Sequence, residues 1–327
     1  YIYLVSHRPL VIIETYIILK LTLNMKILIV GLGSIGSEIA FTFYPSASIT
    51  CIDHGKHFET IKKILPKINY VKGDIHDPSL IYNLSDEPDI VFYCIDTGSV
   101  VSCMENPDKY EKINTSLFQH FLENLYKKFN PHFFLLSSSF VYPDIENITE
   151  QTKPSPETLY GKLRLKQEEI LQDYSSEYTI LRLSNIFGYG NFSDIGSQGA
   201  IEKFIDCIFS HKNISLHGNG KQQVDYLHKS ELMNLLKILV QTNPKIIYNI
   251  SSGKSKSITD IAKIISKIGL EKFNQKSEVS IISSNQLPNS PKIFPTKITN
   301  DYNLSFSSNL EYFILKMMET SSKKLHN

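Results

Sequence analysis

Short apolar runs alternate with segments of helical periodicity over residues 25–184. The runs lie at 26–30, 48–53, 68–71, 89–95, 132–138 and 178–184. This alternation is typical of a parallel sheet with helices on both faces. The runs are apolar throughout, as strands covered on both faces should be. The sequence therefore predicts an α/β fold with a doubly wound parallel sheet.

One segment between two of these runs has a clear helical stripe. Ile113, Leu117, Phe121, Leu125 and Phe129 recur every four residues. Side chains at that spacing share one face of a helix, so the segment is expected to be helical and to bury this stripe.

The pattern changes after about residue 185. A turn-rich segment, 185–199, precedes predicted helices at 200–211, 229–240, 257–268 and near 310–318, with short strands between them. We therefore expect two domains: a cofactor-binding domain over 25–184 and a smaller α+β substrate lobe over 185–327. Some segments of the lobe are expected to return to the sheet.

The first 24 residues differ from both domains. Their apolar run is interrupted by Glu14 and Lys20, which leaves no apolar span of about 20 residues for a bilayer. Met25 then begins MKILIVGLGSIG, a natural start for a domain. We expect residues 1–24 to be an extension outside the fold and leave open whether it is native. An added strand or a membrane-associating segment is the alternative.

Composition excludes several classes of function. The net charge is +1, which gives no reason to expect a nucleic-acid or membrane partner. The cysteines form no CxxC pair, as expected of buried reduced thiols in a cytoplasmic protein. The ten histidines show no HxxxH or HExxH spacing, so no metal site is predicted. We expect a small-molecule substrate, and a homodimer is left open.

A glycine-rich turn follows the first predicted strand. The letters GLGSIG place Gly31, Gly33 and Gly36 around Ser34 and Ile35, at the start of a predicted helix. Glycines at this spacing permit a tight turn and let the backbone approach a pyrophosphate, which binds at the helix N-terminus. All five residues are candidate cofactor ligands.

Acidic residues follow the next two predicted strands. Asp53 ends the second strand, where a carboxylate can accept hydrogen bonds from the ribose hydroxyls of a dinucleotide and repel a 2′-phosphate. The sequence therefore favours NAD over NADP. Asp74 and Ile75 follow the third strand, and Asp74 is placed to reach an adenine amino group or to cap a helix.

These motifs, in this order, resemble a family. With them come YEKINTSLF, LLSSSFVYPD, PETLYGKLRLKQEEIL, LRLSNIFGYGN, GNGKQQVDYLHKSEL and YNISSGKS. The chain from Met25 to about residue 320 is similar to the extended short-chain dehydrogenase/reductases, the NAD-dependent epimerase/dehydratase group that modifies nucleotide sugars. The resemblance implies a Rossmann-type fold, NAD as cofactor and a nucleotide-sugar substrate.

The resemblance also implies a catalytic pair. The family's acid/base tyrosine falls on Tyr160, its hydroxyl partner on Ser138, and a frequent substrate contact on Asn185. A free phenol has a pKa of about 10. Positive charge nearby can lower that pKa by roughly 1–3 units, and a phenol close to working pH is an efficient general base.

The position four residues after the tyrosine departs from the family. A lysine is usual there, and this chain has Arg164. Helical spacing puts Arg164 on the face of Tyr160, while Lys162 and Lys166 are turned away. Arg164 is therefore predicted to be the cation that tunes Tyr160. Arginine preserves the charge, but it cannot take part in a proton relay.

Other positions depart as well. The glycine turn is one residue shorter than is usual in this group. Ile95 and Asp96 stand where small residues usually approach the nicotinamide, and Val224 replaces an arginine that commonly binds a substrate phosphate. Val224 puts the substrate class in doubt more than it does the cofactor.

The leading hypothesis is an NAD-dependent, 4-epimerase-like oxidoreductase acting on a nucleotide sugar. Dehydration is disfavoured because Ser139 and Phe140 replace the Asp-Glu pair usual in dehydratases of the family. An NAD(P)-dependent ketoreductase of a nucleotide sugar is one alternative. The other is a catalytically degenerate NAD-binding sensor or regulatory protein, for which Asp96, Arg164 and Val224 argue.

Overall fold

The computed structural model describes residues 24–325, apart from 76, 96–97, 193–194, 196–198, 283–287 and 308. The expected extension at 1–24 therefore lies almost wholly outside the described residues. No helix within the described part of the chain is long and apolar enough to cross a bilayer.

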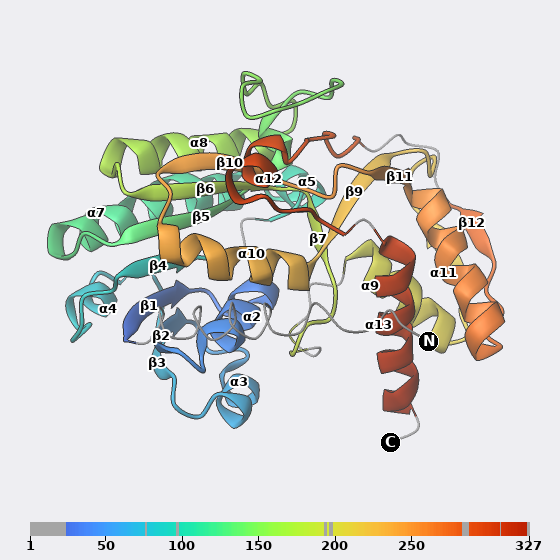
Figure 1. Cartoon of the computed structure of the whole chain (residues 1–327), viewed down its shortest axis with the longest axis horizontal. Helices are drawn as coiled ribbons and strands as arrows, with labels where there is room; N and C mark the ends of the chain where they lie inside the picture. Colours follow the sequence, from blue (N-terminus) through green and yellow to red (C-terminus); the bar gives the residue numbers. More distant parts are fainter. Residues whose placement is uncertain are drawn as a thin grey trace, which may run out of the picture.

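A seven-stranded sheet forms the centre of the larger domain (Figure 1). Its order is β10-β6-β5-β4-β1-β2-β3, and every neighbouring pair is parallel. The strands are β1 (Met25–Val30), β2 (Ala47–Asp53), β3 (Asn69–Lys72), β4 (Ile90–Tyr93), β5 (His132–Ser138), β6 (Tyr178–Leu183) and β10 (Ile246–Ile250). All residues of β4 and β5 are buried, as the apolar runs require. The predicted parallel α/β fold is confirmed.

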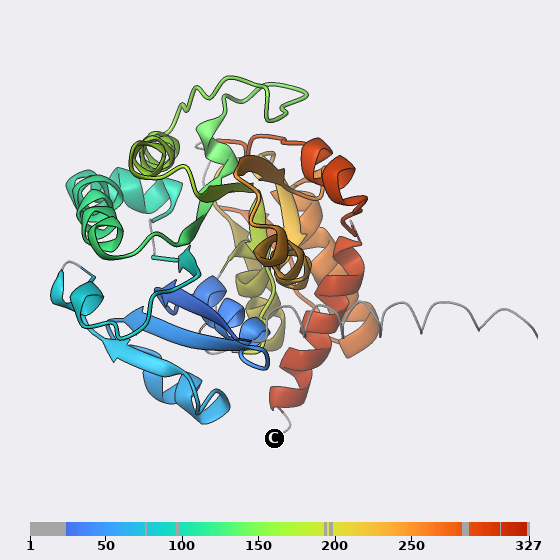
Figure 2. The ribbon, with the colours of Figure 1, turned by 60° about the vertical axis from the view of Figure 1, so that its left-hand side comes forward.

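Helices cover both faces of this sheet (Figure 2). One face packs against α2 (Ser34–Phe43), α3 (Phe58–Ile64), α10 (Lys229–Thr242) and α12 (Thr296–Tyr302). The other packs against α4 (Ser79–Tyr82), α7 (Phe118–Lys128) and α8 (Leu159–Tyr174), with α5 (Val100–Glu105) and α6 (Pro107–Lys112) beside α8. Alternate residues of β1 supply the two cores, with Ile27 and Ile29 on one side and Leu28 and Val30 on the other.

The predicted helical stripe is interrupted. Residues 113–117 form a π-helical turn between α6 and α7, and the extra residue per turn shifts the buried face. Phe121, Leu125 and Phe129 are buried as expected, whereas Ile113 and Leu117 are half-buried. Phe118, outside the stripe, is fully buried in their place.

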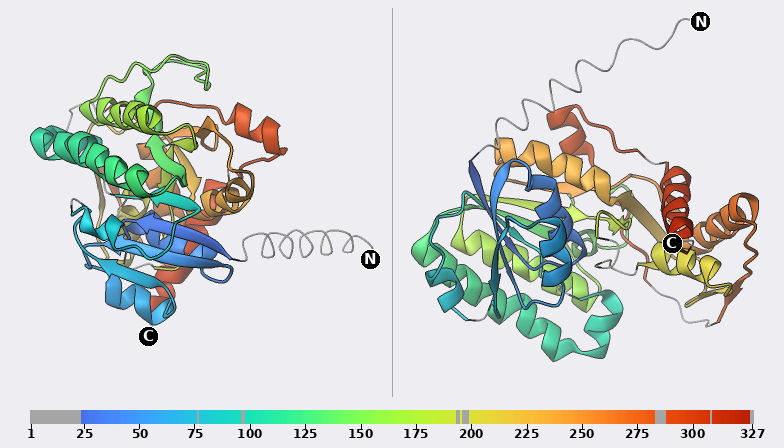
Figure 3. Two further views of the ribbon diagram at one scale, coloured as in Figure 1. Left: turned by 90° about the vertical axis from the view of Figure 1, so that its left-hand side faces the viewer. Right: turned by 90° about the horizontal axis from the view of Figure 1, so that it is seen from below.

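The smaller lobe lies to one side of the sheet domain (Figure 3, right). It contains a sheet of β7 (Asn185–Phe187), β9 (Gln223–His228) and β11 (Ser255–Ser257), and a pair formed by β8 (Ile214–Leu216) and β12 (Val279–Ile281). A separate core holds these strands against α9 (Ala200–Phe209), α11 (Ile258–Phe273) and α13 (Leu310–Leu325). Because β10 and α10 belong to the larger domain, the chain crosses between the two parts repeatedly, and a boundary at residue 184 stays a prediction.

Candidate functional site

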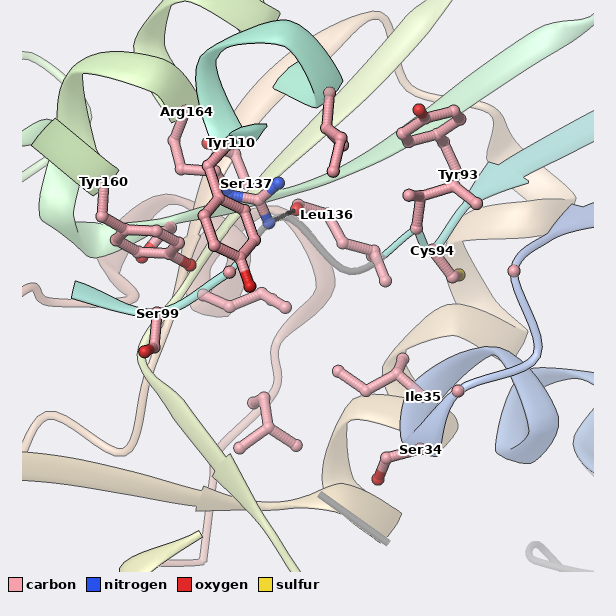
Figure 4. Close-up of a pocket in the computed structure, with 18 of the residues that line it drawn as sticks. Ser34, Ile35, Tyr93, Cys94, Ser99, Tyr110, Leu136, Ser137, Tyr160 and Arg164 are labelled. Atoms are coloured by element: carbon pink, nitrogen blue, oxygen red, sulfur yellow. Dashed lines mark hydrogen bonds between the residues drawn. The ribbon is translucent and has the colours of Figure 1, made fainter. Parts of the chain in front are cut away.

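A cavity of about 1060 Å³ lies at the carboxyl ends of the central strands, where open parallel sheets bind their ligands. It is lined by the β1–α2 turn, the ends of β2 to β5, the start of α8, and parts of β7 and α10. All the predicted site residues except Gly36 line it: Gly31, Gly33, Ser34, Ile35, Asp53, Asp74, Ile75, Ser138, Tyr160, Arg164 and Asn185. In Figure 4, Tyr160 and Arg164 stand on one side of this space, and Ser34 and Ile35 on the other.

The three glycines of the turn have three different roles. Gly31 has φ +93° and donates its N–H to the Ile52 carbonyl at 2.8 Å. A Cβ on Gly36 would lie 2.0 Å from the Gly31 oxygen, so Gly36 lets α2 pack against the turn. A Cβ on Gly33 would meet no atom within 4 Å and would project into open space beside the cavity.

The N-terminus of α2 is available to an anion. No side chain caps it, and its first turn contains no acidic residue. The unpaired N–H groups and the helix dipole there favour a phosphate group. With Gly33 keeping the approach clear, the turn fits the pyrophosphate of a dinucleotide.

Asp53 is a buried carboxylate that shapes this turn. Its Oδ2 accepts a hydrogen bond from Leu32 N at 2.9 Å, and its Oδ1 accepts one from Gly55 N at 2.7 Å. A carboxylate has about four lone-pair sites, so these two bonds leave acceptor capacity for ribose hydroxyls. Asp74 and Ile75 follow β3 along the same wall of the cavity.

Ser138 lines the cavity from the end of β5, and Tyr160 lines it from the start of α8. Ser138 ends β5, and its Oγ accepts a hydrogen bond from Phe140 N at 3.3 Å. Tyr160 is the second residue of α8, whose start is capped by Thr158. A Cβ on Gly161 would lie 2.0 Å from the Phe140 oxygen, so glycine is needed where α8 touches the segment after Ser138.

Arg164 lies one helical turn beyond Tyr160, as the spacing predicts. Its guanidinium carbon is 5.7 Å from the centroid of the Tyr160 ring. Nη2 donates to the Leu136 carbonyl at 2.5 Å (Figure 4). Nη1 donates to Gln167 Oε1 at 2.8 Å. These bonds hold the guanidinium against β5, facing the ring of Tyr160. The tuning of Tyr160 by Arg164 stays a prediction.

A buried network supports this end of β5. Ser137 Oγ donates to Glu168 Oε1 at 2.5 Å, and Arg182 donates to Glu168 Oε2 at 2.6 Å. Arg182 also donates to the hydroxyl of Tyr142 at 2.7 Å. Glu168 and Arg182 are almost completely buried, so neither charge has water to replace its partner. The network fixes α8 to β5 and β6 and therefore fixes the bases of Ser138 and Tyr160.

Cys94 also lines the cavity, which explains why it is only half-buried. Desolvation raises the pKa of its thiol to about 12, and the charge of Arg164 opposes this to a smaller extent. Cys94 is therefore a protonated thiol at neutral pH rather than a nucleophile. Cys51 and Cys103 are buried, and Cys207 is half-buried. In the described part of the chain, none of the four forms a disulfide, and no cluster of metal ligands is present.

Asn185 begins β7 and borders the smaller lobe. Its Nδ2 donates to the Asp225 carbonyl at 3.3 Å and to Ser290 Oγ at 3.0 Å. These bonds orient the side chain at the junction of the two parts. Asp96, which the sequence places near the nicotinamide, lies outside the described residues.

Tyr110 and Lys229 are among the cavity residues that the sequence did not predict. Tyr110 of α6 lines the cavity (Figure 4), and Lys229 lines it from the first turn of α10. A lysine at the first position of an amphipathic helix is the local signal for Lys229. No local pattern indicates Tyr110, because its helix is placed at the cavity by packing against α5, α8 and the π-helical turn.

A second cavity, of about 470 Å³, adjoins β9 in the smaller lobe. Val224 and Tyr226 form part of its wall, together with Lys254, Lys256 and Lys292. The residues that line it include no carboxylate side chain. Its electrostatic character therefore favours an anionic ligand group.

Known proteins resemble the chain over most of its length. It is 23% identical over 320 residues to the dTDP-D-glucose 4,6-dehydratase of Mus musculus, covering 91% of this chain and 88% of the relative. It is 26% identical over 243 residues to a putative UDP-glucose 4-epimerase of Methanocaldococcus jannaschii, covering 72% and 79%.

Solved structures share the fold. A UDP-N-acetylglucosamine 4-epimerase from Methanobrevibacter ruminantium superposes with a TM-score of 0.78 at 21% identity, over 92% of this chain and 99% of that one. The dTDP-glucose 4,6-dehydratase DesIV from Streptomyces venezuelae, solved with NAD, gives 0.79 at 16% identity, over 92% and 98%.

A family model decides the classification. The model of the NAD dependent epimerase/dehydratase family matches residues 27–251, well over half of the chain. The match confirms the predicted resemblance and NAD as the cofactor of the family. The chain belongs to the NAD dependent epimerase/dehydratase family.

Proposed function

We propose that this protein is an NAD-dependent epimerase that inverts a hydroxyl-bearing carbon of a nucleotide sugar. The proposal rests on one observation: the predicted acid–base residues and the predicted cofactor site line the same cavity. Ser138 and Tyr160 line the same space as the uncapped turn at Gly33 and the carboxylate of Asp53. Acid–base groups and a dinucleotide site are thus within reach of one substrate.

The cofactor, held by the β1–α2 turn and Asp53, would supply a reversible hydride acceptor. Tyr160 takes the proton of the sugar hydroxyl at its phenolic oxygen and returns it after the sugar has been presented on its other face. Ser138 donates a hydrogen bond to the same sugar oxygen and orients it. Arg164 supplies a fixed positive charge beside the ring, but it cannot carry the proton onward because guanidinium stays protonated.

The second cavity supports a substrate that carries phosphate. Val224 removes the arginine usual at its position, while Lys254, Lys256 and Lys292 surround the same space. Asn185 on β7 lies opposite Tyr226 on β9, so the two cavities flank one small sheet. We infer that these lysines bind the diphosphate while the sugar reaches Tyr160.

The residues after Ser138 favour epimerisation over elimination of water. Elimination needs an acid and a base at the sugar ring. Neither Ser139 nor Phe140 has a carboxyl side chain. Ser139 is buried, and Phe140 packs edge-on against the Tyr160 ring with centroids 5.8 Å apart. A ketoreductase that prefers NADPH is disfavoured by the carboxylate of Asp53.

The test is turnover of UDP- and dTDP-linked hexoses with NAD, followed by NMR of the sugar products. Tyr160→Phe should lower kcat by about 10²–10⁴-fold, as expected when a general base is lost. Tyr174→Phe is the matched control, because it removes a hydroxyl from the far end of the same helix, outside the cavity. Equal turnover by the two variants would exclude Tyr160 as the acid/base.

A non-catalytic NAD-binding protein is the second candidate. The hydrogen bonds from the Arg164 guanidinium to the Leu136 carbonyl and to Gln167 favour this second candidate. Tight NAD binding without turnover of any nucleotide sugar would support it. A cytoplasmic location and a homodimer stay predictions.

A further inference from the structure

Lys229 is a buried cation at the junction of the two parts of the molecule. It is the first residue of α10, and only 3% of its surface is exposed. Its Nζ donates a hydrogen bond to Ser34 Oγ at 2.8 Å. Ser34 is the first residue of α2, at the turn that fits a pyrophosphate. Both residues line the main cavity.

The described residues do not use all the donors of the Lys229 ammonium. It carries three N–H groups. Among the described residues it bonds only to Ser34 and forms no ion pair with a carboxylate. Glu38 and Glu202 act on the ammonium electrostatically without forming an ion pair with it. Glu38 accepts hydrogen bonds from the main chain and side chain of Asn191. Glu202 Oε1 accepts one from Gly188 N at 2.8 Å, and its buried Oε2 has no hydrogen-bond partner among the described residues.

The surroundings of Lys229 favour an added anion. Burial lowers the pKa of its ammonium, and the charges of Glu38 and Glu202 only partly oppose this. A buried positive charge without a direct counter-ion is unfavourable until one is provided. Gly190 lies close to the Lys229 side chain, because a Cβ added there would be 3.3 Å from Lys229 Cδ.

We propose that Lys229 is a cofactor-binding residue whose ammonium contacts the pyrophosphate of the dinucleotide at the glycine turn. The inference rests on the cofactor of the family and not on the identity of the sugar. A pyrophosphate at the N-terminus of α2 would lie beside Ser34, to which the ammonium is already bonded. Helix α10 would then contribute a charge to a site otherwise built from the β1–α2 turn.

Binding of cofactor fragments tests this role without turnover. Lys229→Met removes the charge with little change in length, and Lys237→Met removes a lysine from the same helix outside the cavity. Calorimetry with ADP-ribose should show an affinity loss of about 10- to 100-fold for Lys229→Met, as expected for a hydrogen bond to a charged group. Adenosine, which lacks phosphate, should bind Lys229→Met and Lys237→Met equally in an NMR titration.

Unchanged ADP-ribose affinity in Lys229→Met would overturn the proposal. A parallel loss of adenosine and ADP-ribose affinity, with a lower Tm, would also overturn it, because Lys229 would then be a structural tie between α10 and α2. If Lys229→Met does not fold, a crystal structure of the parent with ADP-ribose decides the question. Nζ within about 3.2 Å of a pyrophosphate oxygen is expected, and an ammonium bonded to Ser34 alone refutes the role.

Discussion

Gly161→Ala should separate catalysis from cofactor binding. The added methyl group would lie 2.0 Å from the Phe140 oxygen, a main-chain atom that no side-chain rotation can move away. Real Cβ contacts essentially never fall below 3.0 Å, so α8 and the segment after Ser138 must move apart by at least 1.0 Å, which is 3.0 less 2.0. Tyr160 moves with α8, while Ser138 stays with β5.

The size of the effect follows from that displacement. A misplacement of about 1 Å in a catalytic group can lower turnover about 100-fold. Overpacking costs about 1–3 kcal/mol. Alanine in place of glycine inside a helix returns about 1 kcal/mol. We therefore expect a large loss of kcat with a loss of unfolding free energy of only about 0–2 kcal/mol.

Three measurements on the same preparation test this reasoning. Turnover should fall, ADP-ribose affinity should stay at the parent value, and urea unfolding should show the small loss of stability. Gly269→Ala is the control, because it is also a helical glycine, and its Cβ would meet the side chain of Ile208 at 2.9 Å in the smaller lobe. Parent-like turnover in Gly161→Ala would refute the argument that this contact positions Tyr160.

Three further predictions concern specificity and stability. Asp53→Asn should reduce the preference for NAD over NADP in calorimetry, because the 2′-phosphate no longer meets a carboxylate; an unchanged ratio would contradict the role of Asp53. Arg182→Met should lower the urea-unfolding free energy by about 3–5 kcal/mol, because Glu168 is left buried without its cation; a loss below about 1 kcal/mol would contradict this. Burial lowers the pKa of His132 from 6.5 to about 4, so the unfolded chain binds the proton first and stability should fall as pH drops from about 6.5 to about 4. Urea unfolding at pH 7 and pH 5 should differ by up to about 2 kcal/mol, and equal values would contradict a neutral buried His132.

The sheet and the glycine turn could be predicted because their signals are local. An apolar run such as β1, followed by Gly31 and a helix, specifies strand, turn and helix within a few residues of sequence. The placement of Arg164 beside Tyr160 also follows from local geometry, since residues four apart share a helix face. These features need no knowledge of distant parts of the chain.

Other features depend on contacts between distant residues. Lys229 meets Ser34 across 195 positions, and the Arg164 guanidinium meets the Leu136 carbonyl across 28. No periodicity contains either pairing. The π-helical turn at 113–117 escaped prediction for a related reason, since a regular spacing of four residues was read as one continuous helix. Packing against α8 accompanies the extra residue per turn.

The last strand of the sheet bears on how the chain is synthesised. Because β10 pairs with β6 in the register Leu183↔Ile250, the edge of β6 stays open until residues near 250 have left the ribosome. An open strand edge is a template for pairing with other chains, and N-terminal segments emerge and fold first. Nascent chains that end between these two strands therefore expose an aggregation-prone edge. A ribosomal pause in that interval would lower the yield of folded protein, whereas the same pause after β10 would not.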